Sequence, residues 1–377
     1  MRFPGKEKST AFNLSGQFML AFLTLSAFFA GFAVHKCKTT GPTPSDIRSL
    51  TEGEWSMLYE EAFNKSLETY DPSKNGWGIL SYAVFREGNN GVLIGEDNWL
   101  FSTEEFSLQS DWERNYRYNV DFILAVRDYL KASQTELIIV PVPAKARIYE
   151  DKLGRYDYPV YKEGIYGSFI SDMKGSGIAV VNLLPAFQEE KTDESLFVKS
   201  DTHWSPVGSR LAAQSVGAYI HRNYPESLYE KTAFVTHVEG ETLHQGDLSR
   251  YVPLGPFSDD FGISGDLLRK VETVKADEGQ ADLASALFSD ATPPITLVGT
   301  SYSANPVWNF EGFLKESLGS DILNAADEGL GPFETMKKYL GNEAFRNAPP
   351  RVIIWEIPER YLSFSYDLKT SFYNRES

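Results

Sequence analysis

Short apolar segments that alternate with helical segments constrain this fold more than any other feature of the sequence. The apolar segments are typical of buried strands and lie at residues 136–149, 178–187, 294–303, 321–327 and 351–359. Segments with helical periodicity lie between them, at residues 167–177, 205–222, 307–319 and 333–341. Apolar strands that alternate with helices predict a mostly parallel sheet with helices on both faces. We therefore expect an α/β protein.

The remaining segments are less regular. Residues 45–67 and 110–133 have the periodicity of amphipathic helices. Residues 81–101 predict two short strands around the turn signal Asn89-Asn90-Gly91. Residues 223–290 interrupt the alternation with polar sequence, which we interpret as an insertion or lid of long loops.

An uncharged apolar segment at residues 18–34 follows Arg2, Lys6 and Lys8. Its length is at the short limit of a membrane-spanning helix, which needs roughly 17–25 residues. The positive-inside rule then places the N-terminus in the cytoplasm and the rest of the chain outside the inner membrane. A cleaved signal peptide, with Gly31–Ala33 as its small-residue site, is the alternative. Both interpretations place the domain in the bacterial periplasm, and we favour the anchor.

The charge and the cysteine content exclude several classes of function. A formal net charge of -16 argues against nucleic acid as a partner, because phosphates would be repelled. Cys37 is the single cysteine, which excludes an intrachain disulfide and a zinc site built on cysteines. We expect neither a cofactor nor a metal.

The first candidate for chemistry is Ser301, in the segment "LVGTSYS". A strand followed by glycine, threonine, serine and a helix places this serine at the carboxyl edge of the sheet, where chemistry gathers in such folds. There it is positioned to act as a nucleophile beside helical N–H groups. The alternative is a simple helix N-cap, which serine and threonine commonly provide.

A serine nucleophile needs a base, and the chain has five histidines. His203 lies at the expected edge of the sheet, with Asp201 two residues before it, in "DTHWSPVG". A histidine oriented by a carboxylate is the arrangement of a catalytic triad. Helix capping by Asp201 and a structural hydrogen bond for His203 are the alternatives. The two motifs together are more specific than either alone.

These two motifs together resemble those of the alginate O-acetyltransferase family of the AlgJ/AlgX type. The segments "GVLIGEDNWLF", "VPVPAKARIY", "HQGDLSRYV" and "IIWEIPERYL" are similar to the same family. The resemblance spans roughly residues 75–361. It implies an SGNH-hydrolase-like three-layer fold in circularly permuted order, because the acid and the base precede the serine. It also implies that Ser301 is the nucleophile, His203 the base and Asp201 its orienting acid.

The resemblance also suggests an organisation for the chain. Residues 1–36 would be a cytoplasmic n-region and signal-anchor helix, and residues 37–74 a linker and juxtamembrane helix. Residues 75–361 would be the acetyltransferase domain, with residues 223–290 as its insertion, and residues 362–377 a tail. Without a C-terminal carbohydrate-binding module, the chain is expected to be closer to the anchored AlgJ sort.

Several further residues are candidates for the site. No clear counterpart of the usual oxyanion-hole asparagine is present, so the Ser301 N–H and a glycine N–H, from Gly329 or Gly331, are the candidates. Tyr361 resembles the family's tyrosine after the same strand, with packing as the alternative. The candidate substrate-binding residues are Lys145, Arg147 and Trp204. The two cations would hold a uronate carboxylate, or else be ordinary surface charges.

These observations predict two-step acyl transfer through an acetyl-serine onto hydroxyls of an exported polysaccharide, alginate first of all. The resemblance to the family implies that a membrane-bound O-acyltransferase supplies the acetyl group and that other exopolysaccharide-secretion proteins are partners. Cellulose or another exopolysaccharide is an alternative acceptor. A carbohydrate acetyl esterase and an inactive polysaccharide-binding scaffold are the alternative functions.

Overall fold

The computed structural model describes Trp55, Leu58 and residues 70–191, 194–226, 232–276 and 293–372. Within this part of the chain, none of the helices has the length and hydropathy that a membrane crossing requires. The expected membrane segment at residues 18–34 lies outside the described residues, as does nearly all of the expected helix at residues 45–67.

Contacts within the chain define two units. The smaller unit joins Met1–Arg86 to Pro253–Pro256 and contains α4 (Tyr70–Phe85). In this unit α4 packs closely on Pro253, because a Cβ added to Gly78 would lie 2.2 Å from the Pro253 carbonyl oxygen. The larger unit, Glu87–Val252 with Phe257–Ser377, holds the central sheet.

The central sheet of the larger unit has five parallel strands in the order β4-β3-β9-β7-β8. The strands are β3 (Glu136–Val142), β4 (Ala179–Val180), β7 (Ile295–Val298), β8 (Ile322–Asn324) and β9 (Val352–Pro358). All residues of β7 and β9 are buried, which explains their continuous apolar sequences. The expectation of a mostly parallel sheet is confirmed.

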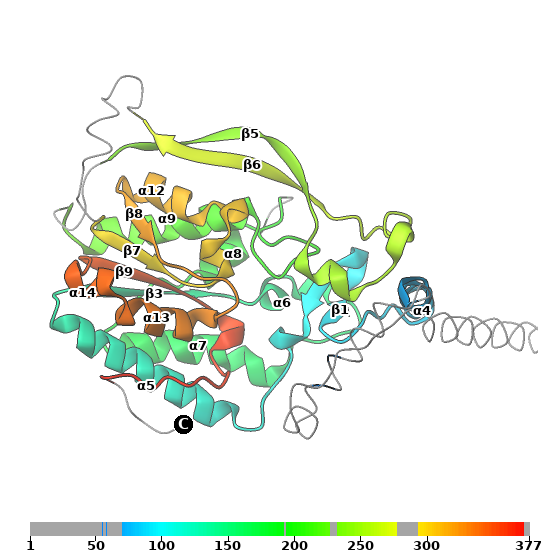
Figure 1. The fold of residues 1–377 in the computed structure, drawn as a ribbon, viewed down its shortest axis with the longest axis horizontal. Coiled ribbons are helices and arrows are strands. Elements are labelled where there is room, and N and C mark those ends of the chain that lie inside the picture. Colours follow the sequence, from blue (N-terminus) through cyan, green and yellow to red (C-terminus); the bar gives the residue numbers. More distant parts are fainter. Residues whose placement is uncertain are drawn as a thin grey trace, which may run out of the picture. The chain divides into compact units, whose positions relative to one another are not determined.

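Helices cover both faces of the sheet (Figure 1). On one face lie α5 (Trp112–Lys131), α7 (Val160–Gly175) and α13 (Gly331–Gly341), and on the other α9 (Pro206–Asn223) and α12 (Phe310–Leu318). Side chains of each strand alternate between the two layers. On β3, Ile138 and Val140 join the core under α9 and α12, whereas Leu137 and Ile139 join the core under α5 and α7. This alternation is the period of two that a strand imposes.

Shorter elements connect these layers. The short helices are α6 (Lys145–Ile148), α8 (Leu184–Glu189), α11 (Ser301–Ala304) and α14 (Glu343–Asn347). The 3₁₀ turns are η1 (Glu96–Asn98), η2 (Thr103–Glu105), η3 (Glu150–Lys152), η5 (Asp247–Tyr251), η6 (Gly255–Phe257), η7 (Pro306–Trp308) and η8 (Glu359–Tyr361).

The predicted strand pair at residues 81–101 is displaced along the chain. Residues up to Phe85 belong to α4, and the antiparallel pair is β1 (Val92–Ile94) with β2 (Leu100–Ser102). The turn between these strands is η1, where Asp97 and Asn98 adopt positive φ angles of 51° and 62°. Aspartate and asparagine tolerate this region better than other side chains. A turn does form at Asn90-Gly91, where Gly91 has a φ angle of 118°, but it precedes the pair instead of joining its two strands.

The predicted strand at residues 178–187 is also shorter than expected. Pairing ends at Val180, and α8 begins at Leu184. The Asn182 side chain accepts a hydrogen bond from the Leu184 N–H, and Pro185 occupies the first turn of the helix. Proline is favoured at this position because it lacks the backbone N–H, which would have no partner in the first turn of a helix.

The polar insertion contains an antiparallel hairpin, whose strands are joined by the loops and 3₁₀ turns of residues 245–265. The hairpin pairs β5 (Phe234–His244) with β6 (Asp266–Lys275) and contains a bulge between Val238 and Gly240. The Thr236 hydroxyl donates to Glu316 of α12, and the Asn309 amide donates to Thr273 of β6. The hairpin therefore lies over the layer of α9 and α12 (Figure 1). Residues 277–290 of the predicted insertion lie outside the described residues.

Candidate active site

Ser301 begins α11 directly after the turn that ends β7. The N-cap of α11 is Thr300, whose Oγ1 accepts a hydrogen bond from the Tyr302 N–H at 3.3 Å. The capping role that a serine here would otherwise fill thus belongs to its neighbour. The Ser301 hydroxyl remains available for another partner.

That partner is His203. The Ser301 hydroxyl donates to Nε2 of His203 at 2.6 Å, and Nδ1 of the same ring donates to Oδ1 of Asp201 at 2.6 Å. The three residues therefore form a continuous chain of hydrogen bonds from hydroxyl to carboxylate. This is the geometry that lets a histidine act as a general base on a serine.

Helix capping does not explain Asp201 either. The following helix, α9, is capped by Ser205, whose Oγ accepts hydrogen bonds from the N–H groups of Val207 and Gly208. Asp201 instead turns its carboxylate toward His203 and also accepts the backbone N–H of His203 at 3.0 Å. A β-bridge between Phe197 and Trp204 holds this loop against the core.

Asp201 is buried, yet it is stabilised as a carboxylate. Its second oxygen accepts hydrogen bonds from Nε2 of His244 at 2.9 Å and from the Asp247 N–H at 3.0 Å. Burial opposes the charge, but hydrogen bonds from His203 and His244 outweigh burial and hold the pKa of Asp201 well below its ordinary range. A carboxylate that remains ionised can stabilise the imidazolium that forms when His203 takes a proton.

Aromatic rings fix the plane of the His203 ring. Trp308 stacks on it with a centroid distance of 5.2 Å and an interplanar angle of 20°. Tyr302 lies against it at 4.7 Å, and its hydroxyl donates to the Thr202 carbonyl at 2.5 Å. Because these two rings hold the imidazole, its two nitrogens stay directed at Asp201 and Ser301.

The sequence matches a known family over most of the described chain. A family model described as "SGNH hydrolase-like domain, acetyltransferase AlgX" matches residues 92–359. The chain belongs to this family. It is 38% identical over 85% of its length to the probable alginate O-acetylase AlgJ of Pseudomonas syringae pv. tomato, of which the match covers 81%.

Solved structures agree with this assignment. The O-acetyltransferase domain of Pseudomonas putida AlgJ superposes with a TM-score of 0.65 at 36% identity, covering 74% of this chain and 94% of that one. Pseudomonas aeruginosa AlgX superposes with a TM-score of 0.55 at 27% identity, covering 72% of this chain and 66% of that one. The predicted family and the SGNH-hydrolase-like α/β fold are therefore confirmed.

All three predicted substrate-binding residues of this AlgJ/AlgX-type domain are engaged in contacts within the protein. Lys145 is 1% exposed, and burial lowers the pKa of its ammonium to about 8. Its Nζ donates to the backbone carbonyls of Leu100, Val198, Lys199 and Asp201. The N–H donors of Lys145 thus join β2 to the Asp201 loop. The prediction that Lys145 binds a uronate carboxylate was wrong.

Arg147 is committed in a similar way. Its guanidinium forms a bidentate pair with Glu359, with its Nη2 2.6 Å from Oε1 and its Nε 3.0 Å from Oε2 of the carboxylate. Nη2 also donates to the Lys162 carbonyl at 2.8 Å. An arginine fork that already holds a buried carboxylate is not available to a uronate, so this prediction was also wrong.

Trp204 is fully buried and therefore does not provide a surface for substrate, contrary to prediction. Its indole N–H donates to the Tyr302 carbonyl at 3.1 Å, and its ring packs on Phe310. Its contacts join the segment after His203 to the segment after Ser301. Trp204 thus supports the distance between base and nucleophile instead of contacting a ligand.

The remaining candidates, Tyr361 and the two glycines, lie in segments that follow strands of the central sheet. Tyr361 is half-buried, and its hydroxyl accepts a hydrogen bond from the Arg360 guanidinium at 3.2 Å. Gly329 and Gly331 have positive φ angles of 81° and 73° in the turn that leads into α13. The roles of Tyr361 and of these glycines at an oxyanion stay predictions.

Two residues of the site were missed because they lie in the polar insertion. His244 ends β5 and Asp247 begins η5. Besides its N–H bond to Asp201, Asp247 accepts hydrogen bonds through its carboxylate from the N–H and hydroxyl of Thr202, at 2.8 and 2.7 Å. The motif "HQGDLSRYV", which is similar to the family, contains both residues and was the one signal that could have found them.

Asp201, His203 and Asp247 each have a potential metal-ligand atom within 4.8 Å of the others. The donor set does not favour a metal, because every oxygen of Asp201 and Asp247 already accepts a hydrogen bond from a protein N–H or O–H. The cluster fits a hydrogen-bonded network better than a cation site.

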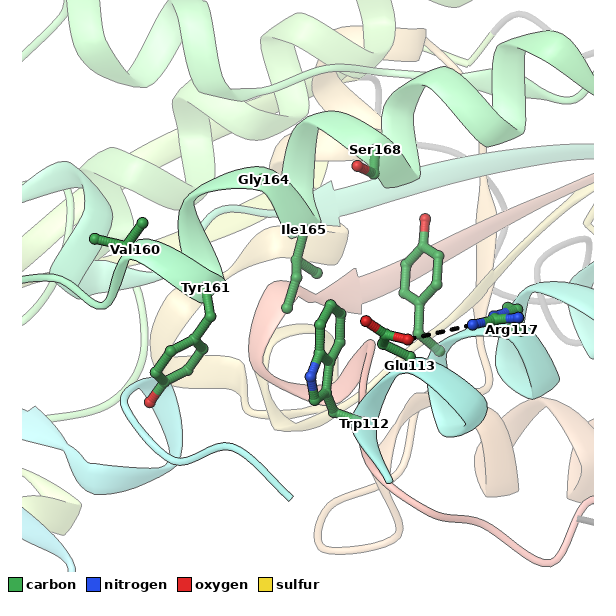
Figure 2. A pocket seen from close by; sticks show the side chains of 9 residues that line it. Trp112, Glu113, Arg117, Val160, Tyr161, Gly164, Ile165 and Ser168 are labelled. Atoms are coloured by element: carbon green, nitrogen blue, oxygen red, sulfur yellow. Dashed lines mark hydrogen bonds and ion pairs between the residues drawn. The ribbon is translucent and has the colours of Figure 1, made fainter. Parts of the chain in front are cut away.

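A separate cavity of about 420 Å³ lies between the N-terminal ends of α5 and α7 (Figure 2). Figure 2 shows Trp112 and Tyr161 on opposite sides of it, with the ion pair of Glu113 and Arg117 along α5. Its lining includes none of the three triad residues. We therefore treat it as distinct from the candidate active site.

Proposed function

We propose that this protein is an O-acetyltransferase that acetylates hydroxyl groups of an exported polysaccharide through an acetyl-Ser301 intermediate. Alginate is the leading candidate for the polysaccharide. The observation that carries the proposal is the hydrogen-bonded chain of Ser301, His203 and Asp201, with 2.6 Å at each of its two contacts. The family and the names of its AlgJ and AlgX members support the choice of acetyl transfer and of alginate.

The first half-reaction loads the serine. Ser301 Oγ attacks the carbonyl carbon of an acetyl ester while Nε2 of His203 takes the hydroxyl proton. The bond from the acetyl carbon to the donor's oxygen breaks, and the His203 imidazolium returns its proton to that oxygen. Asp201 stabilises the imidazolium throughout through the contact at Nδ1. The products are acetyl-Ser301 and the donor alcohol.

The second half-reaction transfers the acetyl group from Ser301 to a sugar. Nε2 of His203 takes the proton of a sugar hydroxyl, whose oxygen attacks the acetyl carbon of acetyl-Ser301. The ester bond to Ser301 Oγ breaks, and the proton on His203 passes to Oγ. Water can attack acetyl-Ser301 with the help of the same groups, and the product is then acetate. Exclusion of water and binding of the sugar therefore decide between acetyl transfer and hydrolysis.

The proposal extends to where the protein works and to its partners. We place it in the periplasm, anchored in the inner membrane by residues 18–34, with a membrane-bound O-acyltransferase as acetyl donor and polysaccharide-secretion proteins as neighbours. The support is the apolar segment, the positive charges before it and the resemblance to the anchored members of the family. Protease digestion of intact spheroplasts tests the placement, because only an external domain would be degraded.

The experiment that tests the acyl intermediate is intact-mass measurement of the full chain after brief exposure to an activated acetyl ester. We expect the mass of one acetyl group on the wild-type protein and none on Ser301→Ala. A folded wild-type protein that neither cleaves the ester nor gains mass would refute the proposal and favour the binding scaffold.

The acceptor is tested by adding glycans to the loaded protein. Oligomannuronate, cello-oligosaccharides and buffer alone are compared by counting acetyl groups on sugar and free acetate. Acetylated oligomannuronate supports the proposed function, and preference for cello-oligosaccharide would change the acceptor. Acetate release without sugar acetylation, together with deacetylation of acetylated alginate, would establish an esterase.

A further inference from the structure

One carboxylate of the candidate site is shared by two histidines. Oδ1 of Asp201 lies 2.6 Å from Nδ1 of His203, and Oδ2 of the same side chain lies 2.9 Å from Nε2 of His244. The second histidine comes from the hairpin, at the end of β5. The triad mechanism described above uses only the first of these two contacts.

The donors divide between the two oxygens of the carboxylate. Oδ1 accepts the backbone N–H and the Nδ1–H of His203, whereas Oδ2 accepts the Asp247 N–H and the Nε2–H of His244. Each oxygen thus has one backbone donor and one imidazole donor. Four donors in two pairs fix the rotation of the carboxylate, and with it the direction of its bond to His203.

The two imidazoles also contact one indole. Trp308 stacks on the face of His203 and meets His244 edge to face, with a centroid distance of 5.2 Å and an interplanar angle of 76°. His244 is therefore held at its ring as well as at its nitrogen. Its side chain keeps 19% of its surface exposed, so it can exchange protons with water.

The charged groups around His244 are mainly acidic. Asp201 faces it from the loop before α9, Asp247 from η5 and Asp266 from β6. Lys145 of α6 is a cation close to Asp201, because its Nζ donates to the Asp201 carbonyl at 2.9 Å. The hydrogen bond to Asp201 raises the pKa of His244 against the opposing effect of burial.

We propose that His244 is a positioning residue for the acyl transfer, which holds the outer oxygen of Asp201 so that the inner oxygen stays on the Nδ1–H of His203. The inference rests on the proposed function, because it assigns a role at the same triad. His244 touches neither Ser301 nor the reacting atoms, and it acts through Asp201.

Two consequences follow for catalysis. Without His244 the outer oxygen keeps only the Asp247 N–H, so the carboxylate can rotate and the His203 ring loses its fixed orientation. The negative charge of Asp201 is then shared with one imidazole instead of two. The imidazolium form of His203 becomes more stable, and the acidic limb of the pH–rate profile moves to higher pH.

The test compares three variants of the full chain in the acetylation of Ser301 by an activated ester. His244→Ala removes the donor, and His244→Gln keeps an amide N–H at a similar reach. His237→Gln is the matched control, since His237 lies on the same strand, is exposed and is remote from Asp201 in the strand register. Thermal unfolding of each variant shows whether it is folded.

For His244→Ala we expect a roughly tenfold or larger loss of kcat, an unchanged KM and an acidic limb at higher pH. His244→Gln should retain most of the activity, and His237→Gln should match the wild type. If His244→Ala is folded and matches His237→Gln in both rate and pH profile, the proposal is overturned. Equal loss in folded His244→Gln and His244→Ala overturns it as well.

A spectroscopic readout separates this inference from the proposed function. The proton between Nδ1 of His203 and Asp201 is expected at low field in the proton NMR spectrum of the free protein, because the contact is only 2.6 Å. In His244→Ala this resonance should shift or broaden, whether or not the protein turns over an ester. An unchanged resonance overturns the positioning role, whereas a failure of Ser301 to accept acetyl refutes the function alone.

Discussion

The carboxylate of Glu356 lies beneath the serine turn, where its Oε2 accepts the Thr300 N–H at 2.7 Å. The same oxygen accepts the Ser303 hydroxyl at 3.0 Å, and the side chain is fully buried. Strand β9 thus supports the loop that carries Ser301 through hydrogen bonds, in addition to sheet pairing. Burial raises the pKa of Glu356 to about 7, even though hydrogen bonds from Thr300 and Ser303 oppose the rise.

This buried acid makes stability depend on pH. The pKa of Glu356 rises from its ordinary value of 4.5 to about 7 in the folded protein, which therefore binds more protons than the unfolded chain between these values. The free energy of unfolding should fall as pH rises through this window, by up to about 3 kcal/mol. Glu356→Gln should flatten the dependence, as measured by urea denaturation at pH 5 and pH 8. Glu343→Gln, at an exposed site, should leave it unchanged.

The glycine before this turn is required by the same carboxylate. A Cβ added to Gly299 would lie 2.4 Å from Oε2 of Glu356 and 2.9 Å from Oγ of Ser303. Gly299→Ala should therefore displace the turn and lower the rate of Ser301 acetylation by roughly tenfold or more, since small misplacements are costly at a nucleophile. The measurement is the rate of ester cleavage by Gly299→Ala, once its circular dichroism spectrum has shown that the variant is folded. Gly341→Ala, which meets nothing within 4 Å, is the control and should be neutral.

Asp201→Asn should separate the role of the charge from that of the shape. The amide preserves the volume but removes the charge that stabilises the His203 imidazolium. We expect kcat for ester cleavage to fall by roughly 10³–10⁴-fold, with little change in KM. Single-turnover kinetics with an activated ester measure the effect. A loss below tenfold would mean that His203 does not depend on this carboxylate.

Lys145→Met should destabilise the fold and leave the affinity for polysaccharide unchanged. The variant keeps most of the volume but leaves the carbonyls that Nζ contacts in a buried region without their donor. The free energy of unfolding should fall by about 3 kcal/mol or more. Urea denaturation measures it, and Lys174→Met at an exposed site of α7 is the control. Loss of alginate binding by a stable variant would restore the substrate-binding interpretation.

The sequence allowed the sheet and the triad to be predicted for physical reasons. The strands are buried on both faces, and a run of apolar residues such as 352–355 is the direct sign of that burial. Ser301 follows one such strand, and Asp201 and His203 are neighbours in the chain. Local patterns therefore placed the three candidates at one edge of the sheet, and the resemblance to the family supplied their roles as nucleophile, acid and base.

The contacts of individual side chains could not be predicted from local sequence patterns. Lys145 and Arg147 follow a strand at the correct edge, but their partners, such as Glu359, come from segments far away in the chain. Neither the spacing nor the periodicity of the sequence indicates a partner that is so distant in the chain. The hairpin was missed because no residue of β5 is buried, so its sequence lacks the alternation of a half-buried strand. His244 was missed together with the strand that carries it.

The position of β9 has a consequence for the order in which the protein is made. This strand lies in the middle of the sheet, between β3 and β7, yet it is the last strand in the chain. A ribosome therefore completes the segments with Asp201, His203 and Ser301 before it makes the strand that joins the two halves of the sheet. Glu356, which supports the serine turn, arrives with that strand. A chain truncated before residue 352 therefore contains all three triad residues but lacks the support that holds them together.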